Sequence, residues 1–213
     1  MTVVNLRAKE DVNLKVVILG PDGAGKSSVI QGLIVRLKEG WPVVKMRHLK
    51  PRLAKLRPGD PVTIVVDPHG KPRRSALVSL AKILVWLLEE WYANLFQDQR
   101  ETLLICDRYY HDLLVDPIRY RYGGPAWAAK LVGQLMPQPD MWILLDAPPD
   151  VLQARKHEVP WEETSRQRDA YMVFVRKQRN HLIVDASRSL DKVIADVAHA
   201  IIGAPIEGTG NRE

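Results

Sequence analysis

The chain has 213 residues, which is enough for one domain with a full core, and its 46% hydrophobic and 26% charged residues exclude a disordered protein. A single cysteine, Cys106, excludes a disulfide framework and a multi-cysteine zinc site, and it fits a reducing compartment. The formal net charge of +6 indicates an affinity for anionic partners.

Apolar strands and helices alternate along the chain. A continuous apolar run over residues 14–20 predicts a strand buried on both faces, and apolar residues at helical spacing follow it up to Gly40. The other predicted elements, in chain order, are a strand at 42–48, a short strand at 62–66, a helix at 74–96, a strand at 102–107, a helix at 125–136, a strand at 141–146, a helix starting at 148, a charged helix at 162–177, a strand at 181–186 and a helix at 190–202. We expect one domain over residues 1–203 and a flexible tail over 204–213.

Two stretches bear on localisation. Residues 1–14 contain no apolar signal-peptide core. The longest apolar stretch, residues 75–88, contains Lys82 and is shorter than the ~18–20 residues that a membrane span needs. We therefore expect a cytoplasmic protein with no membrane partner.

The positive charge lies in residues 45–74, where nine Lys and Arg stand against two Asp. This segment is either a solvated loop or a surface for polyanions: nucleic acid, phospholipid or a small phosphorylated substrate. A nucleic-acid partner is not favoured, because the segment lacks the interleaved aromatic residues on which single strands stack.

The alternation predicts an α/β fold with three α/β/α layers and a five-stranded, mainly parallel sheet. Because the first strand is followed by the phosphate-binding pattern GxxxxGK[ST] at residues 20–27, we expect the P-loop NTPase form of this fold. In such a sheet the ligand site lies at the carboxyl ends of the strands.

Residues 20–27, Gly-Pro-Asp-Gly-Ala-Gly-Lys-Ser, match the phosphate-binding pattern GxxxxGK[ST] at every required position. Small residues let backbone N–H groups converge on phosphate oxygens, aided by the positive end of the helix that follows. Lys26 is expected to contact the terminal phosphates, and the Ser27 hydroxyl to bind Mg²⁺. The alternative is a chance glycine turn, which the position between a buried strand and an amphipathic helix disfavours.

Asp107 and Arg108 follow a buried strand, so both are placed to face the phosphate loop. The carboxylate is a candidate Mg²⁺ ligand, and the guanidinium a candidate to neutralise charge during phosphoryl transfer. The alternative is a structural ion pair at the strand end. Asp146, which ends the strand at 141–146, is a rival metal ligand that no arginine follows.

The class of P-loop protein is narrowed by what the sequence lacks. It has no guanine-reading NKxD motif and none of the accessory motifs of motor or helicase ATPases. The compact chain, with its basic segment on the acceptor side, instead suggests a small-molecule kinase that uses ATP and Mg²⁺.

The motifs resemble the thymidylate kinase-like family of nucleoside monophosphate kinases. The resemblance rests on GPDGAGKSS (20–28), CDRYY (106–110), PDMWILLDAPPDVLQAR (139–155), SRQRDAY (165–171) and VDAS (184–187), which together cover most of residues 16–202. It implies an acceptor contact at Asp22 and a DR(Y/H) motif at Asp107, Arg108 and Tyr109. It also implies a mobile helical lid over about 155–170, in which Arg166 and Arg168 supply catalytic charge. The nucleotide-binding candidates are Gly20, Asp22, Gly23, Ala24, Gly25, Lys26, Ser27, Ser28, Arg155 and Ala186.

The lid also has a physical argument. Lys156, Arg166 and Arg168 can swing over the phosphates and exclude water while supplying positive charge. The family resemblance implies that members without an arginine at the position of Ala24 rely on the lid instead. The alternative for Arg166 and Arg168 is a solvated helix face.

The acceptor side departs from the family. The family's REPGG-like segment is replaced by RHLKPRLAKLRP (47–58), and its thymine-reading helix by VWLLEEWY (85–92). Arg47, Tyr120 and Arg121 join Asp22, Arg108 and Tyr109 as acceptor-binding candidates. Tyr120 and Arg121 are suited to stacking on a ring or pairing with a phosphate, and ordinary surface positions are the alternative.

Three functions stay open. The first is transfer of the γ-phosphate of ATP to a dTMP-like nucleoside monophosphate. The second is a kinase of a non-nucleotide small molecule, such as a sugar or glycan precursor. The third is a nucleic-acid-linked P-loop ATPase. The apolar faces of the helices at 74–96 and 125–136 are candidates for a homodimer interface, with simple core packing as the alternative.

Overall fold

The computed structural model describes residues 13–38, 40–41, 43–48, 72–96, 102–156 and 159–203. These form twelve elements: β1 (Leu14–Leu19), α1 (Lys26–Leu37), β2 (Val43–His48), α2 (Ala76–Phe96), β3 (Thr102–Asp107), α3 (Asp112–Val115), α4 (Ala126–Leu135), β4 (Met141–Asp146), α5 (Pro149–Arg155), α6 (Trp161–Val175), β5 (His181–Asp185) and α7 (Leu190–Gly203). The predicted strand at 62–66, most of the basic segment and the tail at 204–213 lie outside the described residues.

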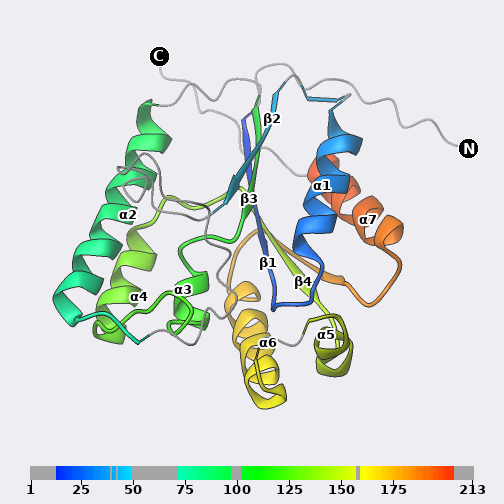
Figure 1. Cartoon of the computed structure of the whole chain (residues 1–213). Coiled ribbons are helices and arrows are strands. Elements are labelled where there is room, and N and C mark those ends of the chain that lie inside the picture. Colours follow the sequence, from blue (N-terminus) through cyan, green and yellow to red (C-terminus); the bar gives the residue numbers. More distant parts are fainter. Residues whose placement is uncertain are drawn as a thin grey trace, which may run out of the picture.

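The five strands form one sheet in the order β2-β3-β1-β4-β5, and every pairing between them is parallel. The predicted α/β fold with a five-stranded sheet is therefore confirmed. Since parallel neighbours need crossover connections, helices run back along both faces and make three layers (Figure 1).

Alternate residues of β1 belong to two separate cores, because successive side chains of a strand point to opposite faces. Val16 and Ile18 pack with residues of α1 and α7 on one face of the sheet. Val17 and Leu19 pack with residues of α2, α4 and α6 on the other face. All four side chains are fully buried. The continuous apolar run in the sequence thus reflects burial on both sides.

At most of their ends, the helices differ from the predicted bounds by one or two residues. α2 begins at Ala76 instead of residue 74, and Arg74 before it donates its backbone N–H to the carbonyl oxygen of Arg121, 2.9 Å away. The short helix α3 was not predicted, since four residues are too few for an apolar period to show. Within the described part of the chain, no helix combines the length and hydropathy that a membrane crossing requires.

The carboxyl ends of the strands gather at one edge of the sheet, where the loop after β1, the loop after β3, α5 and α6 all lie (Figure 1). The residues predicted to bind the donor nucleotide and the metal come from this edge. α6, which carries the arginines of the predicted lid, packs against α5 and β4.

Candidate active site

The loop after β1 turns sharply and lies close to neighbouring backbone. Gly20 has φ +151° and Gly23 has φ +85°, and residues other than glycine adopt these backbone conformations only with strain. A Cβ on Gly20 would lie 2.6 Å from the carbonyl oxygen of Leu145, and one on Gly23 would collide with that of Leu152. Glycine is therefore required at both positions for the loop to pack against β4 and α5.

Lys26 begins α1 and folds back into this loop. Its Nζ donates hydrogen bonds to the carbonyl oxygens of Gly20 and Pro21, at 2.7 and 2.8 Å. Burial, together with the nearby Arg108 guanidinium, lowers the pKa of Lys26 to about 7. An anion among these groups would stabilise the charged ammonium, so the position suits a phosphate ligand.

Two adjoining pockets open beside the loop and share Gly25, Ser28 and Arg155. The larger, of about 490 Å³, is also lined by Asp22, Gly23, Lys26, Ser27, Asp107, Arg108, Arg119 and Lys156. The smaller, of about 230 Å³, is also lined by Ala24, Val29, Ala186, Arg188, Leu190 and Val193. One pocket is rich in charge and the other in apolar side chains, as the phosphates and the base of a nucleotide would require.

Arg155 connects the two pockets. Its Nη1 donates to the carbonyl oxygen of Ala186 at 2.8 Å, which links the end of α5 to the turn after β5. The structure therefore brings all the predicted nucleotide-binding residues to these pockets, with Gly20 directly behind them as an acceptor for Lys26.

Arg108 sits at the centre of an ion-pair network after β3. Its backbone has φ +68°, which is uncommon for a residue with a side chain. Its guanidinium donates to Asp22 Oδ1 and Asp112 Oδ2, both at 2.6 Å. Arg119 pairs with the other oxygen of Asp22. Two guanidinium groups thus flank one carboxylate at the wall of the larger pocket.

Asp112 anchors this network from the interior. The residue is fully buried, and it accepts hydrogen bonds from Arg108, from Tyr120 at 2.7 Å and from Tyr171 on α6. Burial and the Asp112 carboxylate raise the pKa of both tyrosines well above its ordinary value. The sequence analysis missed Asp112 and Arg119. The spacing of Asp112 four residues after Arg108 was the only signal for it, and Arg119 had none.

Ser27 and Asp107 line the larger pocket together, beside Lys26. A hydroxyl and a carboxylate are oxygen ligands of the kind Mg²⁺ prefers, and Mg²⁺ commonly takes its remaining ligands from phosphates and water. No group of three or more His, Cys, Asp and Glu side chains suited to a metal occurs in the described ranges. The donor set therefore fits a magnesium ion that arrives with a nucleotide.

Asp146, the rival metal ligand at the end of β4, is paired with an arginine of α6. Arg168 of α6 binds both its carboxylate oxygens, at 2.7 and 2.8 Å. Neither residue lines the two pockets. Arg166 is likewise held by Glu163 and by the carbonyl oxygen of Val115 at 2.9 Å. In this structure both predicted lid arginines link α6 to its neighbours, Arg168 to the end of β4 and Arg166 to α3, and their catalytic role stays a prediction.

Three acceptor-binding candidates do not face the larger pocket. Tyr109 is buried in the core, where its hydroxyl donates to the carbonyl oxygen of Pro137 at 2.6 Å. Arg47 pairs with Glu90 of α2. Arg121 donates to the carbonyl oxygen of Pro72 at 2.9 Å. Each of these side chains thus has a protein partner outside the larger pocket, and its role in acceptor binding stays a prediction.

Tyr120 is placed differently. Its hydroxyl binds Asp112, and its ring meets Trp86 of α2 edge to face at 5.7 Å. Tyr120 thereby joins α2 to the network around Arg108 without lining the larger pocket.

Comparison with known proteins agrees with this geometry. No family model matches the chain. A probable thymidylate kinase from Pyrobaculum aerophilum is 29% identical over 206 residues. The match covers 87% of this chain and 95% of that protein. A solved thymidylate kinase from Candida albicans is 18% identical, with a TM-score of 0.60 over 89% of this chain and 91% of the other. The chain is thus similar in sequence to a probable thymidylate kinase and shares the fold of a solved one.

Proposed function

We propose that the chain is an ATP- and Mg²⁺-dependent kinase that transfers the terminal phosphate of ATP to a nucleoside monophosphate resembling dTMP. The observation that carries the proposal is the pair of adjoining pockets, which join an apolar chamber to a charged one through Gly25, Ser28 and Arg155. The relationship to a probable thymidylate kinase supports the choice of acceptor.

The residues of the larger pocket suit in-line transfer, which needs positioning and charge neutralisation more than covalent chemistry. An oxygen of the acceptor phosphate forms a bond to the terminal phosphorus of ATP while the bond from that phosphorus to the bridging oxygen of ADP breaks. Lys26 and Arg108 stabilise the charge that spreads over the transferred group. Ser27 and Asp107 would hold Mg²⁺, which when bound neutralises and orients the phosphates.

Arg108 and Arg119, which Asp22 holds in position, are the residues best placed to receive the acceptor phosphate. The Asp22 carboxylate already holds both guanidinium groups beside the larger pocket, at 2.6 Å in the case of Arg108. Arginine pairs readily with phosphate oxygens through two parallel hydrogen bonds. Arg119 therefore takes, in this proposal, the role that the sequence analysis assigned to Arg47.

We also propose that the kinase is a homodimer through α2 and α4. The two helices pack against each other, and Trp91 of α2 donates to the carbonyl oxygen of Leu135 at 2.9 Å. Their outer faces expose large apolar side chains: Leu77, Leu84, Leu88, Tyr92, Leu95 and Phe96 on α2, and Trp127 and Leu131 on α4. An apolar surface this continuous is typical of an interface.

Light scattering over a range of concentrations tests the dimer. The wild-type protein should have the mass of two chains, and Leu88→Arg, at a position 69% exposed, should have the mass of one. A wild-type mass of one chain at every concentration would exclude the dimer.

A coupled ADP-release assay with Mg²⁺ and ATP tests the reaction. Acceptors are dTMP, the other nucleoside monophosphates, and free and phosphorylated sugars, with Lys26→Ala as the inactive control. Turnover on a nucleoside monophosphate that Lys26→Ala abolishes is the expected result. Turnover on a sugar alone would show that the protein is a kinase of a non-nucleotide small molecule. ATP hydrolysis that depends on nucleic acid would instead indicate a nucleic-acid-linked ATPase.

A further inference from the structure

A separate cavity, of about 820 Å³, which we call the rear pocket, lies at the opposite edge of the sheet from the phosphate loop. It is bordered by Leu14, the first residue of β1, by Trp142 near the start of β4, and by Asn180, which precedes β5. Because the strands are parallel, these starting residues share one edge while the phosphate loop follows the other. The cavity is therefore separate from the proposed nucleotide site.

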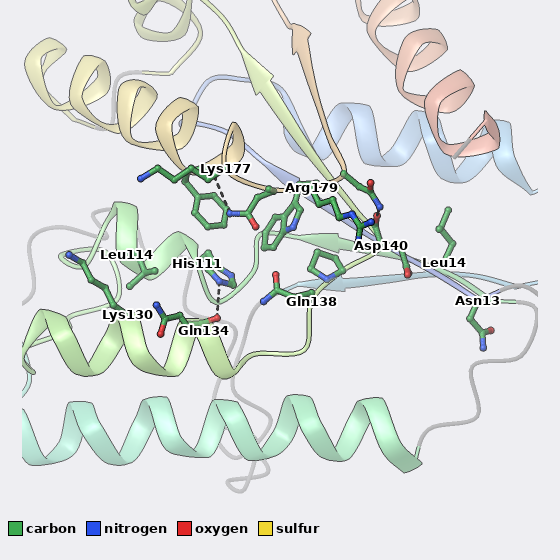
Figure 2. Close-up of a pocket in the computed structure, with 16 residues that line it drawn as sticks. Asn13, Leu14, His111, Leu114, Lys130, Gln134, Gln138, Asp140, Lys177 and Arg179 are labelled. Atoms are coloured by element: carbon green, nitrogen blue, oxygen red, sulfur yellow. Dashed lines mark hydrogen bonds between the residues drawn. The ribbon is translucent and has the colours of Figure 1, made fainter. Parts of the chain in front are cut away.

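Two helices form the sides of this rear pocket. Lys130 and Gln134 come from α4, and Phe174 comes from α6, with Lys177 and Arg179 in the turn that follows it (Figure 2). The volume is within the range of roughly 300–1,000 Å³ that is usual for small-molecule sites.

The rear pocket has an aromatic floor. His111 stacks on Phe174 with ring centroids 4.9 Å apart, and it meets Trp142 edge to face at 5.1 Å. Its Nε2 lies 3.0 Å from the carbonyl oxygen of Gly133 (Figure 2). A carbonyl oxygen can only accept, so Nε2 carries the hydrogen. Burial lowers the pKa of His111 to about 4, which leaves the imidazole neutral at pH 7.

Nδ1 of His111 is consequently an unprotonated acceptor. It is buried and has no hydrogen-bond partner among the described residues. A buried polar atom of this kind normally has a partner, because leaving it unsatisfied costs free energy. Nδ1 has almost no accessible surface, so a donor in the cavity does not reach it in this conformation.

Positive charge surrounds the mouth of the rear pocket. Lys130 and Lys177 are exposed, and Arg179 lines the same cavity. The one carboxylate in the lining, Asp140, accepts the backbone N–H of Lys15 at 2.6 Å. The balance favours an anionic ligand group at the mouth.

From this combination we infer that the rear pocket binds a second small molecule: a planar aromatic ring joined to a phosphate, as in a nucleotide. The ring lies against the aromatic floor, and the phosphate faces Lys130 and Lys177.

The rear pocket shares two elements with the proposed active site. His111 directly precedes Asp112, the anchor of Arg108, and Phe174 lies on α6 three residues after Tyr171, which also binds Asp112. A ligand there contacts both elements, so it acts as an effector of the transfer reaction. This regulatory part rests on the proposed function, whereas the binding site does not.

Calorimetric titration with the mono- and triphosphates of adenosine, guanosine, cytidine, uridine and thymidine tests the site. We compare wild type with the double variant Lys130→Glu/Lys177→Glu, with Lys26→Ala, and with Lys192→Glu, a charge reversal at an exposed position of α7. At least one nucleotide should bind about tenfold or more weakly to the double variant, because losing one charge-assisted hydrogen bond already has that effect. The same nucleotide should bind Lys26→Ala and Lys192→Glu as it binds wild type.

The inference is overturned if no nucleotide of the panel binds, or if every one that binds is weakened by Lys26→Ala and not by the double variant. Gln134→Trp, at an exposed position of α4, blocks the same pocket independently and should reproduce the loss. Saturating the rear pocket should also change the turnover number of wild type but not of the double variant. An unchanged turnover number would exclude the effector role.

Discussion

Replacing Asp112 by asparagine tests the network that positions Arg108. The substitution keeps the size of the side chain but removes the charge that pairs with a buried guanidinium at 2.6 Å. Removing one partner of a buried ion pair costs about 3–5 kcal/mol. We expect the lower end of that range, about 3 kcal/mol, because Arg108 keeps Asp22 as a second partner.

Urea unfolding at pH 7 measures this loss. With a denaturant dependence of about 2 kcal/mol per molar, the midpoint should fall by about 1.5 M. Tyr171→Phe removes only one hydrogen bond to the carboxylate and should cost about 1.5–3 kcal/mol. Asp169→Asn, at an exposed position of α6, is the matched control and should stay within about 0.5 kcal/mol of wild type.

The turnover number should fall as well, by about 100-fold, since misplacing a group at the reacting phosphate by about 1 Å has that effect. A midpoint for Asp112→Asn equal to that of wild type would refute the reasoning, because the carboxylate would then not be the anchor of Arg108. A destabilised variant with a wild-type turnover number would limit Asp112 to a structural role.

Three further predictions concern other parts of the site. Arg119→Gln should raise the KM for the acceptor about tenfold or more in steady-state kinetics while leaving the KM for ATP unchanged, because Arg119 is assigned to the acceptor phosphate. Arg155→Leu should raise the KM for ATP about tenfold or more and leave the KM for the acceptor unchanged, since Arg155 joins the two pockets proposed for the donor nucleotide. His111 has a folded pKa of about 4, below its ordinary value of 6.5, so its contribution to stability is present above pH 6.5 and is lost as the pH falls toward 4. The stability difference between wild type and His111→Gln should therefore shrink by about 3 kcal/mol between pH 7 and pH 4 in urea unfolding, and a constant difference would contradict the assignment.

Much of the donor side could be predicted from the sequence, because its signals are local. The strands β1, β3 and β4 show as continuous apolar runs, since each is buried on both faces. The glycines of the phosphate loop mark backbone that other residues cannot adopt, and Lys26 and Ser27 follow them directly in the chain. Motif spacing therefore places these groups without knowledge of the rest of the fold.

The acceptor side could not be predicted in the same way, because its contacts join distant segments. Arg119 meets Asp22 across 97 positions of the chain, and Tyr171 meets Asp112 across 59. Tyr109 and Tyr110 are adjacent in the sequence, yet each donates its hydroxyl to a different carbonyl in the core. Which arginine faces the pocket depends on where the chain after β3 packs, and no local pattern records that.

The sequence by itself determined the parallel sheet, the glycine-rich loop and the edge where the proposed nucleotide site lies, since burial and backbone restriction leave periodic or local marks on residue choice. Only the tertiary structure decided that Arg166 and Arg168 contact α3 and β4, that Asp112 anchors Arg108, and that His111 lies in the floor of the rear pocket. The reason is physical: charged and polar side chains take their role from the partner they meet, and that partner is chosen by packing.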